Sequence, residues 1–240
     1  MILRLDLHTH IWEASGFQPP NLAWAEQVVQ QAKARGIDGI AITEHRNREP
    51  SFAYKRLIDQ HFQGQLLVFP GWEIEVHPAR DYFASYDMGE FLLPNGLVFR
   101  NYCHPGHPSK SIEIEDVQSI EVDNLLHNWH IDTPKVQAVA KKHGLLMTRV
   151  SDAHRLEDLG KNFVEIELKD LLDRAKRRDG WEEESMMSAI PWPSKEWDEE
   201  IRQGKLRNVE AEDRLERMIN KGCREGRRQR LHLRMKAEQG

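Results

Sequence analysis

Apolar and polar positions along residues 1–170 follow two alternating periods. Runs that are apolar throughout, or apolar at every second position, predict strands, and apolar residues at helical spacing predict helices. The expected strands cover 2–7, 37–43, 66–76, 81–86, 97–103, 119–122, 145–150 and 163–168, and the expected helices 22–35, 51–62 and 133–143. Strands that alternate with helices indicate an α/β fold with a mostly parallel sheet or barrel, whose functional residues collect at the carboxyl ends of the strands.

Local signals mark the ends of two of these helices. Asn21 is the expected cap of the first helix, and Gly36 is expected to end it. Thr133 is the expected cap of the third helix, with Pro134 at its first position.

The bulk composition narrows the class of protein. The chain has 240 residues, 39% hydrophobic and 30% charged, with a net charge of -5. This is enough for one sizeable domain, and the charge does not favour nucleic acid or membrane. No apolar run approaches the ~18 residues needed to span a bilayer. Cys103 and Cys223 form no CxxC pair, so we expect neither a disulfide framework nor a zinc ribbon, and a cytoplasmic location.

The composition changes near residue 180. Residues 181–200 are acidic and contain three tryptophans, and residues 221–240 carry seven Lys or Arg against two Glu. We expect a domain over 1–180 and a charged, helical extension over 181–240, with a helix at 208–220. Such an extension is most often a solvated helix, and its functional alternative is contact with nucleic acid or an acidic partner.

Residues of the metal-ligand type lie at the ends of several expected strands. His8 and His10 share one face of the first strand, because side chains alternate with period two. Zinc, manganese or iron takes three or more N or O ligands at about 2.0–2.2 Å, and a carboxylate such as Glu73 can bridge two ions. The segments concerned are His8-Thr9-His10, Thr43-Glu44-His45, Gly71-Trp72-Glu73, Cys103-His104-Pro105-Gly106, Glu121-Val122-Asp123-Asn124 and Ser151-Asp152-Ala153-His154.

Taken in order, these segments resemble the motifs of the polymerase-and-histidinol-phosphatase (PHP) phosphoesterases. That family shows D-L-H-x-H, T-D-H, G-x-E, H-P, E-x-x-N and S-D-A-H. Here the matching stretches are DLHTH (6–10), TEH (43–45), GWE (71–73), HPG (104–106), EVDN (121–124) and SDAH (151–154). The resemblance implies a distorted seven-stranded, TIM-like β/α barrel that binds two or three divalent ions (Mn, Fe or Zn) at its mouth.

The resemblance also implies a role for individual residues. A hydroxide activated by the metals, held through Glu73 and Asp152, would attack phosphorus. Separately from the resemblance, Arg46 and Arg155 each adjoin an implied ligand, and this adjacency places them to contact the substrate phosphate. The substrate would be a phosphate mono- or diester of a small metabolite, nucleotide or oligonucleotide. The implied ligands are His8, His10, Glu73 and Asp152 for the first ion, Glu73 and His104 for the second, and His45 and His154 for the third.

Three departures from the family pattern leave alternatives open. Ser15 stands where an acid or histidine is expected for the third ion, and Glu13 could replace it. A further ligand to the second ion is expected between G-x-E and H-P, where His77 and Asp81 are candidates. Glu44 replaces the shorter acid of the T-D-H motif. The changes are compatible with a divergent substrate, a two-metal site or weakened catalysis.

Other functions and roles stay open at this point. The chain could be an amidohydrolase-like hydrolase of a non-phosphate bond, or a catalytically weak metal-binding domain that acts through its charged extension. Glu121 and Asn124 either orient ligands or end a strand. His107, His127 and His130 lie near the expected mouth and could contact substrate.

Overall fold

The computed structural model describes residues 1–79, 83–178 and 180–181. The expected extension, apart from Trp181, and its helix at 208–220 lie outside the described residues. The domain boundary at residue 180 therefore stays a prediction. Within the described part, no helix is both long and apolar enough to cross a membrane.

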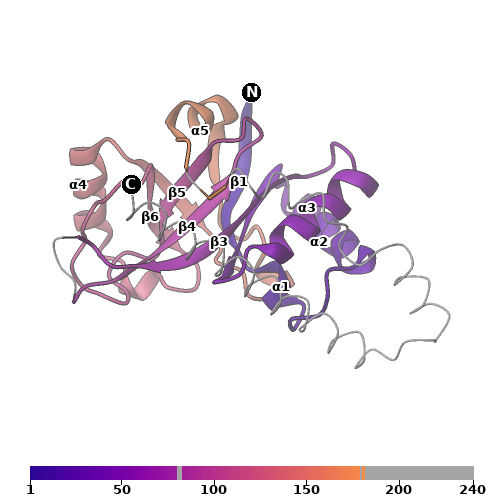
Figure 1. Ribbon diagram of the computed structural model, residues 1–240, viewed down its shortest axis with the longest axis horizontal. Helices are drawn as coiled ribbons and strands as arrows, with labels where there is room; N and C mark the ends of the chain where they lie inside the picture. The colour runs from indigo at the N-terminus through magenta and orange to yellow at the C-terminus, as the bar shows by residue number, and fades with distance from the viewer. Residues whose placement is uncertain (80–82, 179, 182–240) are drawn as a thin grey trace, which may run out of the picture. The chain divides into compact units, whose positions relative to one another are not determined.

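The described chain forms one eight-stranded sheet flanked by helices (Figure 1). The strand order is β7-β6-β5-β4-β3-β2-β1-β8. The strands are β1 (Ile2–Thr9), β2 (Gly39–His45), β3 (Leu67–Val76), β4 (Tyr86–Leu92), β5 (Val98–Tyr102), β6 (Ser119–Asn124), β7 (Leu146–Val150) and β8 (Val164–Glu167). The helices are α1 (Ile11–Ala14), α2 (Leu22–Arg35), α3 (Glu49–His61), α4 (Thr133–His143) and α5 (Leu168–Arg174), with short 3₁₀ turns η1 (Asn128–His130) and η2 (Leu156–Asp158).

The expected α/β class is confirmed. The seven strands implied by the family resemblance are wrong, because the described residues form eight. β1–β2–β3 and β5–β6–β7 pair in parallel, whereas β3–β4–β5 and β1–β8 pair antiparallel. The link from β3 to β4 is too short for a crossover helix, so the chain returns as a hairpin. The strand expected over 81–86 is misplaced, because among the described residues 83–86 only Tyr86 belongs to a strand, β4.

The barrel-like sheet is nearly closed at one end, where β1 meets the segment after β7. The His8 carbonyl accepts from Asp152 N at 2.9 Å, and His10 N donates to the Ala153 carbonyl at 2.9 Å. At the other end of β1, Ile2 to Leu5 pair with β8. One edge of β1 is thus shared by two partners, β8 at its start and the segment after β7 at its end. The ligand-type residues lie at the end of the barrel where β1 meets the segment after β7, and we call this end the mouth.

Helix ends follow the expected signals with one exception. The Asn21 side chain accepts from Trp24 N, and Gly36 ends α2 at φ 69°. In α4, Asp132 rather than Thr133 is the cap, because its carboxylate accepts from Lys135 N. Thr133 instead donates its hydroxyl to the Val122 carbonyl at 3.4 Å, which ties α4 to β6.

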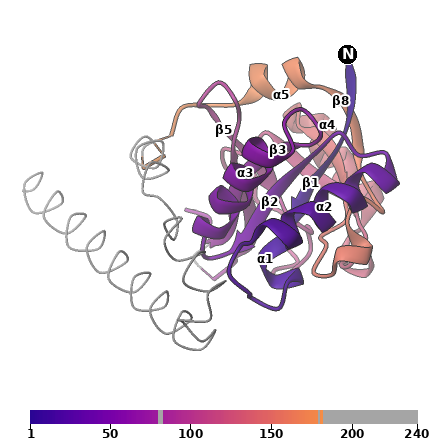
Figure 2. The same ribbon diagram turned by 90° about the vertical axis from the view of Figure 1, so that its right-hand side faces the viewer.

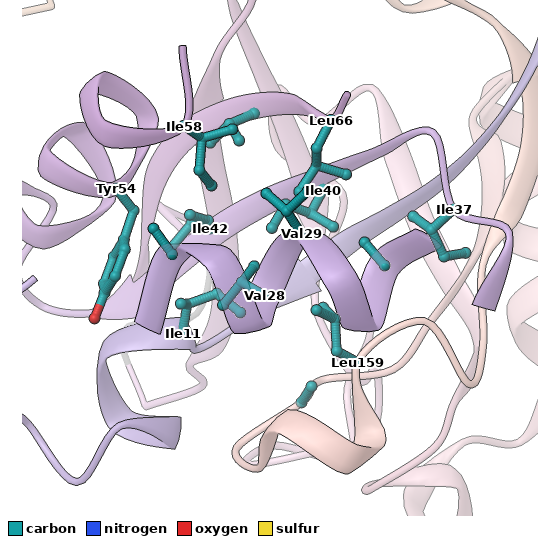
Figure 3. Close-up of a cluster of buried hydrophobic side chains, with 14 residues drawn as sticks. Ile11, Val28, Val29, Ile37, Ile40, Ile42, Tyr54, Ile58, Leu66 and Leu159 are labelled. Atoms are coloured by element: carbon teal, nitrogen blue, oxygen red, sulfur yellow. The ribbon is translucent and has the colours of Figure 1, made fainter. Parts of the chain in front are cut away.

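Two apolar layers cover the two faces of the sheet near β1. Leu3, Leu5 and Leu7 pack inside the barrel with the phenylalanines of β3, β4 and β5. On the outer face, α2 and α3 bury a second cluster that includes Val28, Ile40 and Ile58 (Figures 2 and 3). The mouth residues therefore rest on an interior leucine layer and are braced from outside by helices.

At Gly71 the backbones of β3 and β4 approach so closely that there is no room for a side chain. A Cβ there would collide with the Glu90 carbonyl oxygen and lie 2.7 Å from Phe91 Cβ. We expect Gly71→Ala to lower the free energy of unfolding by about 1–3 kcal/mol in urea titrations, through overpacking. Gly89→Ala is the matched control on β4, because its Cβ would meet Cys103 Sγ at an ordinary 3.4 Å. Equal losses in the two variants would contradict the packing argument.

Candidate metal centre

His8 and His10 both point into the mouth, as expected from their spacing, and both are fully buried. The pairing of β1 with β2 shifts register between Asp6 and Thr9. A regular strand would place Leu7 and His8 on opposite faces. The shift lets the two histidines stand directly above the interior leucine layer.

Glu73, on β3 opposite the last residue of β2, lies at the centre of the site. Its Oε1 is 3.1 Å from His104 Nε2, while its Oε2 is 3.0 Å from His45 Nε2. The same Oε2 lies 3.5 Å from His8 Nε2 and 3.6 Å from His10 Nε2. The two oxygens thus face different sets of imidazoles, which is the arrangement that a bridging carboxylate needs.

Asp152 completes the buried group from the segment after β7. Its Oδ1 is 3.1 Å from His10 Nε2 and 3.5 Å from His8 Nε2. All seven residues expected as ligands meet at the mouth, in overlapping groups whose ligand atoms lie within 4.8 Å of one another. Four of these groups are His8, His10 and Asp152; His8, Glu73 and Cys103; His104, His127 and Asp152; and His10, Glu13, His45 and His154.

Glu13 occupies the position that Ser15 leaves. Glu13 Oε1 lies 2.5 Å from His45 Nδ1, and its Oε2 lies 3.7 Å from His154 Nε2. The Ser15 hydroxyl instead donates to the Trp12 carbonyl at 2.6 Å. Of the alternatives left open by the sequence, the geometry favours Glu13.

Glu44 explains how Glu13 reaches the site. This buried carboxylate accepts from Trp12 N at 2.6 Å and Glu13 N at 3.4 Å, the free amides of the first turn of α1. Burial raises the pKa of Glu44 to about 8, although these amide bonds act to lower it. The longer side chain of the TEH motif therefore positions α1, and α1 carries Glu13.

A further histidine, which is neither of the two expected candidates, joins the group. His77 Nδ1 donates to the Ala84 carbonyl at 3.1 Å and takes no part in the groups above. Asp81 lies outside the described residues. His127 lies with His104 and Asp152, its Nε2 3.7 Å from Asp152 Oδ2. The signal for His127 in the sequence was its place three residues after Asn124, at a strand end.

Glu121 supports the site from behind. Its carboxylate accepts from His8 Nδ1 at 2.8 Å, His104 N at 2.7 Å and Asn101 Nδ2 at 2.7 Å. It also accepts from Asn124 Nδ2 at 2.9 Å, and that amide nitrogen lies 3.1 Å from Asp152 Oδ2. Because a carboxylate only accepts, His8 carries a proton on Nδ1, and its Nε2 is the nitrogen left to face a metal ion in the mouth.

The two arginines expected to contact substrate differ in their surroundings. Arg46 follows His45 and is exposed, and its backbone N donates to the Glu73 carbonyl at 3.0 Å. The Arg155 side chain donates to Asp158 Oδ2 at 2.9 Å and pairs with Glu157 at 3.2 Å. Arg46 is thus fixed beside the site by its backbone, whereas Arg155 is engaged by neighbouring acids.

Charge is distributed unevenly among the imidazoles. Burial lowers the pKa of His10 to about 4. Hydrogen bonds to Glu13 and Glu73 raise the pKa of His45 to about 10. Burial acts to lower the pKa of His104, but its bond to Glu73 and the charges of Glu73 and Glu121 together raise this pKa to about 9. Burial would raise the pKa of Asp152, yet neighbouring His8 and His10 hold it well below its usual range.

The residues of the mouth fit a metal centre on their own chemistry. Glu73 Oε2 and Asp152 Oδ1 are buried without a hydrogen bond of good geometry, although imidazole nitrogens surround each of them at 3.0–3.6 Å. Buried carboxylate oxygens without donors are costly. A cation among these atoms would satisfy both oxygens and the imidazole lone pairs together.

Comparison with known proteins agrees with this picture. No family model matches the chain. A curated protein of Caldicellulosiruptor bescii, named probable phosphatase, is 26% identical over 208 residues, covering 67% of this chain and 84% of that protein. A protein of the same name from Caldicellulosiruptor saccharolyticus is 24% identical with the same coverage.

Two solved structures share the fold. PsfC from Pseudomonas syringae matches with a TM-score of 0.50 and 16% identity, over 79% of this chain and 97% of that chain. A Bifidobacterium adolescentis protein, described as a candidate metal-dependent phosphoesterase, matches with a TM-score of 0.51 and 13% identity, over 72% of this chain and 96% of that chain. The resemblance to the PHP phosphoesterases drawn from the motifs is confirmed.

The role of Glu121 predicts a change in metal affinity. In Glu121→Gln, an amide group would face donors that now meet a carboxylate. We expect the affinity for Zn²⁺ to fall about 10–100-fold, measured by competition with a chromogenic chelator, because His8 and His104 lose their orientation. Glu90→Gln is the control, since Glu90 is a buried carboxylate that binds Trp72 and Arg100. An equal loss of affinity in both variants would make the effect one of general stability.

The raised pKa values of His45 and His104 predict proton release on metal binding. Without metal at pH 7.5, each imidazole carries a proton on both ring nitrogens, because the pKa values of His45 and His104 are about 10 and about 9. A metal ion displaces these protons, so affinity should rise with pH. Calorimetric titrations in buffers of different ionisation enthalpy should give different binding enthalpies, with fewer protons released by His45→Gln. Enthalpies independent of the buffer would refute this.

Proposed function

We propose that the chain is a metal-dependent phosphoesterase that hydrolyses a phosphate mono- or diester of a small metabolite, nucleotide or oligonucleotide. The observation that carries the proposal is the meeting of all seven expected ligands around Glu73 at one end of the barrel. The names of the curated relatives, both probable phosphatases, support a phosphate ester as substrate.

Three groups of residues would hold divalent ions, which we take to be Mn, Fe or Zn. Such ions, when bound, polarise phosphoryl oxygens and favour hydroxide over water near neutral pH. To the sequence-based assignment we add His127 in the second group and Glu13 in the third, because each lies with the other members of its group. The proposed groups are His8, His10, Glu73 and Asp152; Glu73, His104 and His127; and Glu13, His45 and His154.

The protein's own groups supply position and a dry environment. His8, His10 and Glu73 are buried, so the ester would react on a surface where charges interact more strongly than in water. Arg46, exposed beside His45, would pair with a phosphate oxygen. Arg155 would bind substrate only by exchanging its bonds to Glu157 and Asp158.

Loss of a central ligand should abolish turnover. We expect His8→Ala and Asp152→Ala to lower the turnover of p-nitrophenyl phosphate or a nucleotide by about a hundredfold or more, since removing a ligand costs more than disturbing its support. His61→Ala and Asp59→Ala serve as controls, because both residues are exposed on α3. Unchanged turnover in both ligand variants would refute the proposal.

A substrate panel separates this function from hydrolysis of other bonds. The purified protein, loaded in turn with Mn²⁺, Fe²⁺ and Zn²⁺, would be offered phosphate monoesters, phosphate diesters, amides and lactones. Turnover of the phosphate esters supports the proposal. Turnover of amides or lactones alone would identify the protein as an amidohydrolase-like enzyme.

A further inference from the structure

His104 presents its two ring nitrogens to two different groups. Its Nε2 lies 3.1 Å from Glu73 Oε1 and belongs to the metal centre described above. Its Nδ1 lies on the other side of the ring, 3.9 Å from Asp87 Oδ2. The side chain is only 6% exposed, so neither nitrogen depends on bulk water for its partner.

Asp87, His104 and His107 converge beside the metal centre. Each offers a ligand atom, and these atoms lie within 4.8 Å of one another. The rings of His104 and His107 are 5.5 Å apart and inclined at 66°. Among the described residues, the Nδ1 atoms of both histidines are buried without a hydrogen-bond partner. Two buried imidazole nitrogens without hydrogen-bond partners, grouped with a carboxylate, are the kind of donor set that binds a transition-metal ion.

The backbone holds these three residues in place before any ligand arrives. Cys103 N donates to the Asp87 carbonyl at 2.9 Å, and His104 N donates to Glu121 Oε2 at 2.7 Å. His107 N donates to the His104 carbonyl at 3.2 Å. Gly106, at φ 106°, lies so close to the His130 carbonyl that a Cβ would collide with it. The site is therefore built by strand pairing and a tight turn.

We propose that Asp87, His104 Nδ1 and His107 form an outer site for one more divalent transition-metal ion, beside the three groups of the metal centre and linked to the second of them through His104. Nitrogen ligands with one carboxylate suit Zn²⁺, Co²⁺ or Mn²⁺. When ions occupy both sides of His104, its ring has released both protons to solvent and offers one lone pair to each ion. The outer ion then shares His104 with the second group.

The outer ion has a chemical reason to be there if the proposed function holds. Asp87 and Glu75 are directly paired across β3 and β4, so they point to the same face beside the mouth. Two carboxylates on the approach to the site would repel a phosphate ester. A bound cation reverses the local charge and would attract it. This role rests on the phosphoesterase proposal, but the site itself does not.

Counting bound ions tests the site without using activity. Full-length protein stripped with a chelator would be dialysed against Co²⁺ and its metal content measured, with the visible absorption of Co²⁺ recorded. We expect Asp87→Asn/His107→Gln to bind one ion fewer than the unmodified protein, with the remaining ions bound equally tightly. Glu75→Gln is the matched control, because it removes a charge from the same face without removing a ligand, and it should keep the full count.

The outcomes separate this site from the proposed function. An unchanged count in the double variant, or the loss of more than one ion, would overturn the outer site, since the two residues would then bind nothing or belong to the inner groups. Where circular dichroism shows that the double variant is misfolded, His107→Gln alone should weaken the last ion to bind by roughly tenfold or more. If the double variant binds one ion fewer but the unmodified protein hydrolyses no phosphate ester, the outer site stands and the proposed phosphoesterase function is rejected.

Discussion

Burial of several carboxylates at one point is the constraint on which the rest of this structure depends. Glu73, Glu121 and Asp152 are nearly or fully buried within one cluster, where like charges repel strongly and water cannot screen them. Each must therefore meet donors or cations. The imidazoles from β1, β2 and the segments after β5 and β7 supply these donors, because their ring nitrogens lie beside the buried carboxylate oxygens. The side-chain amide nitrogens of Asn101 and Asn124 also donate to one of these acids, Glu121.

Much of the fold was predictable, because local periodicity identifies strands and helices that bury one face. The strands β1, β2 and β3 were placed from the sequence to within a few residues. β4 was misplaced, because YDMGEFL mixes charge and glycine with its apolar positions and is held by long-range pairing with β3 and β5. The short α1 was missed for a related reason, since Glu44, distant in sequence, stabilises it.

The site was predictable where ligands adjoin strands and unpredictable where loops fold back. His127 reaches the group because Asn124 Oδ1 accepts from both Leu126 N and His127 N at 2.9 Å, which turns the chain. That turn cannot be read from residue spacing alone. Asp87 gave no signal, because its strand was misplaced. Glu13 was one of two alternatives, and only the position of α1 distinguishes it from Ser15.

The seam that closes the barrel joins residues from opposite ends of the domain. Asp152 N donates to the carbonyl of His8, and the side chains of the same two residues face the same candidate ion. Coordination would therefore act as a reversible cross-link across a loop of some 144 residues, restricting the unfolded chain in the way that a disulfide does. In a protein whose described cysteine is a single buried thiol, metal supply would then set how long the folded chain persists as well as whether the site can react.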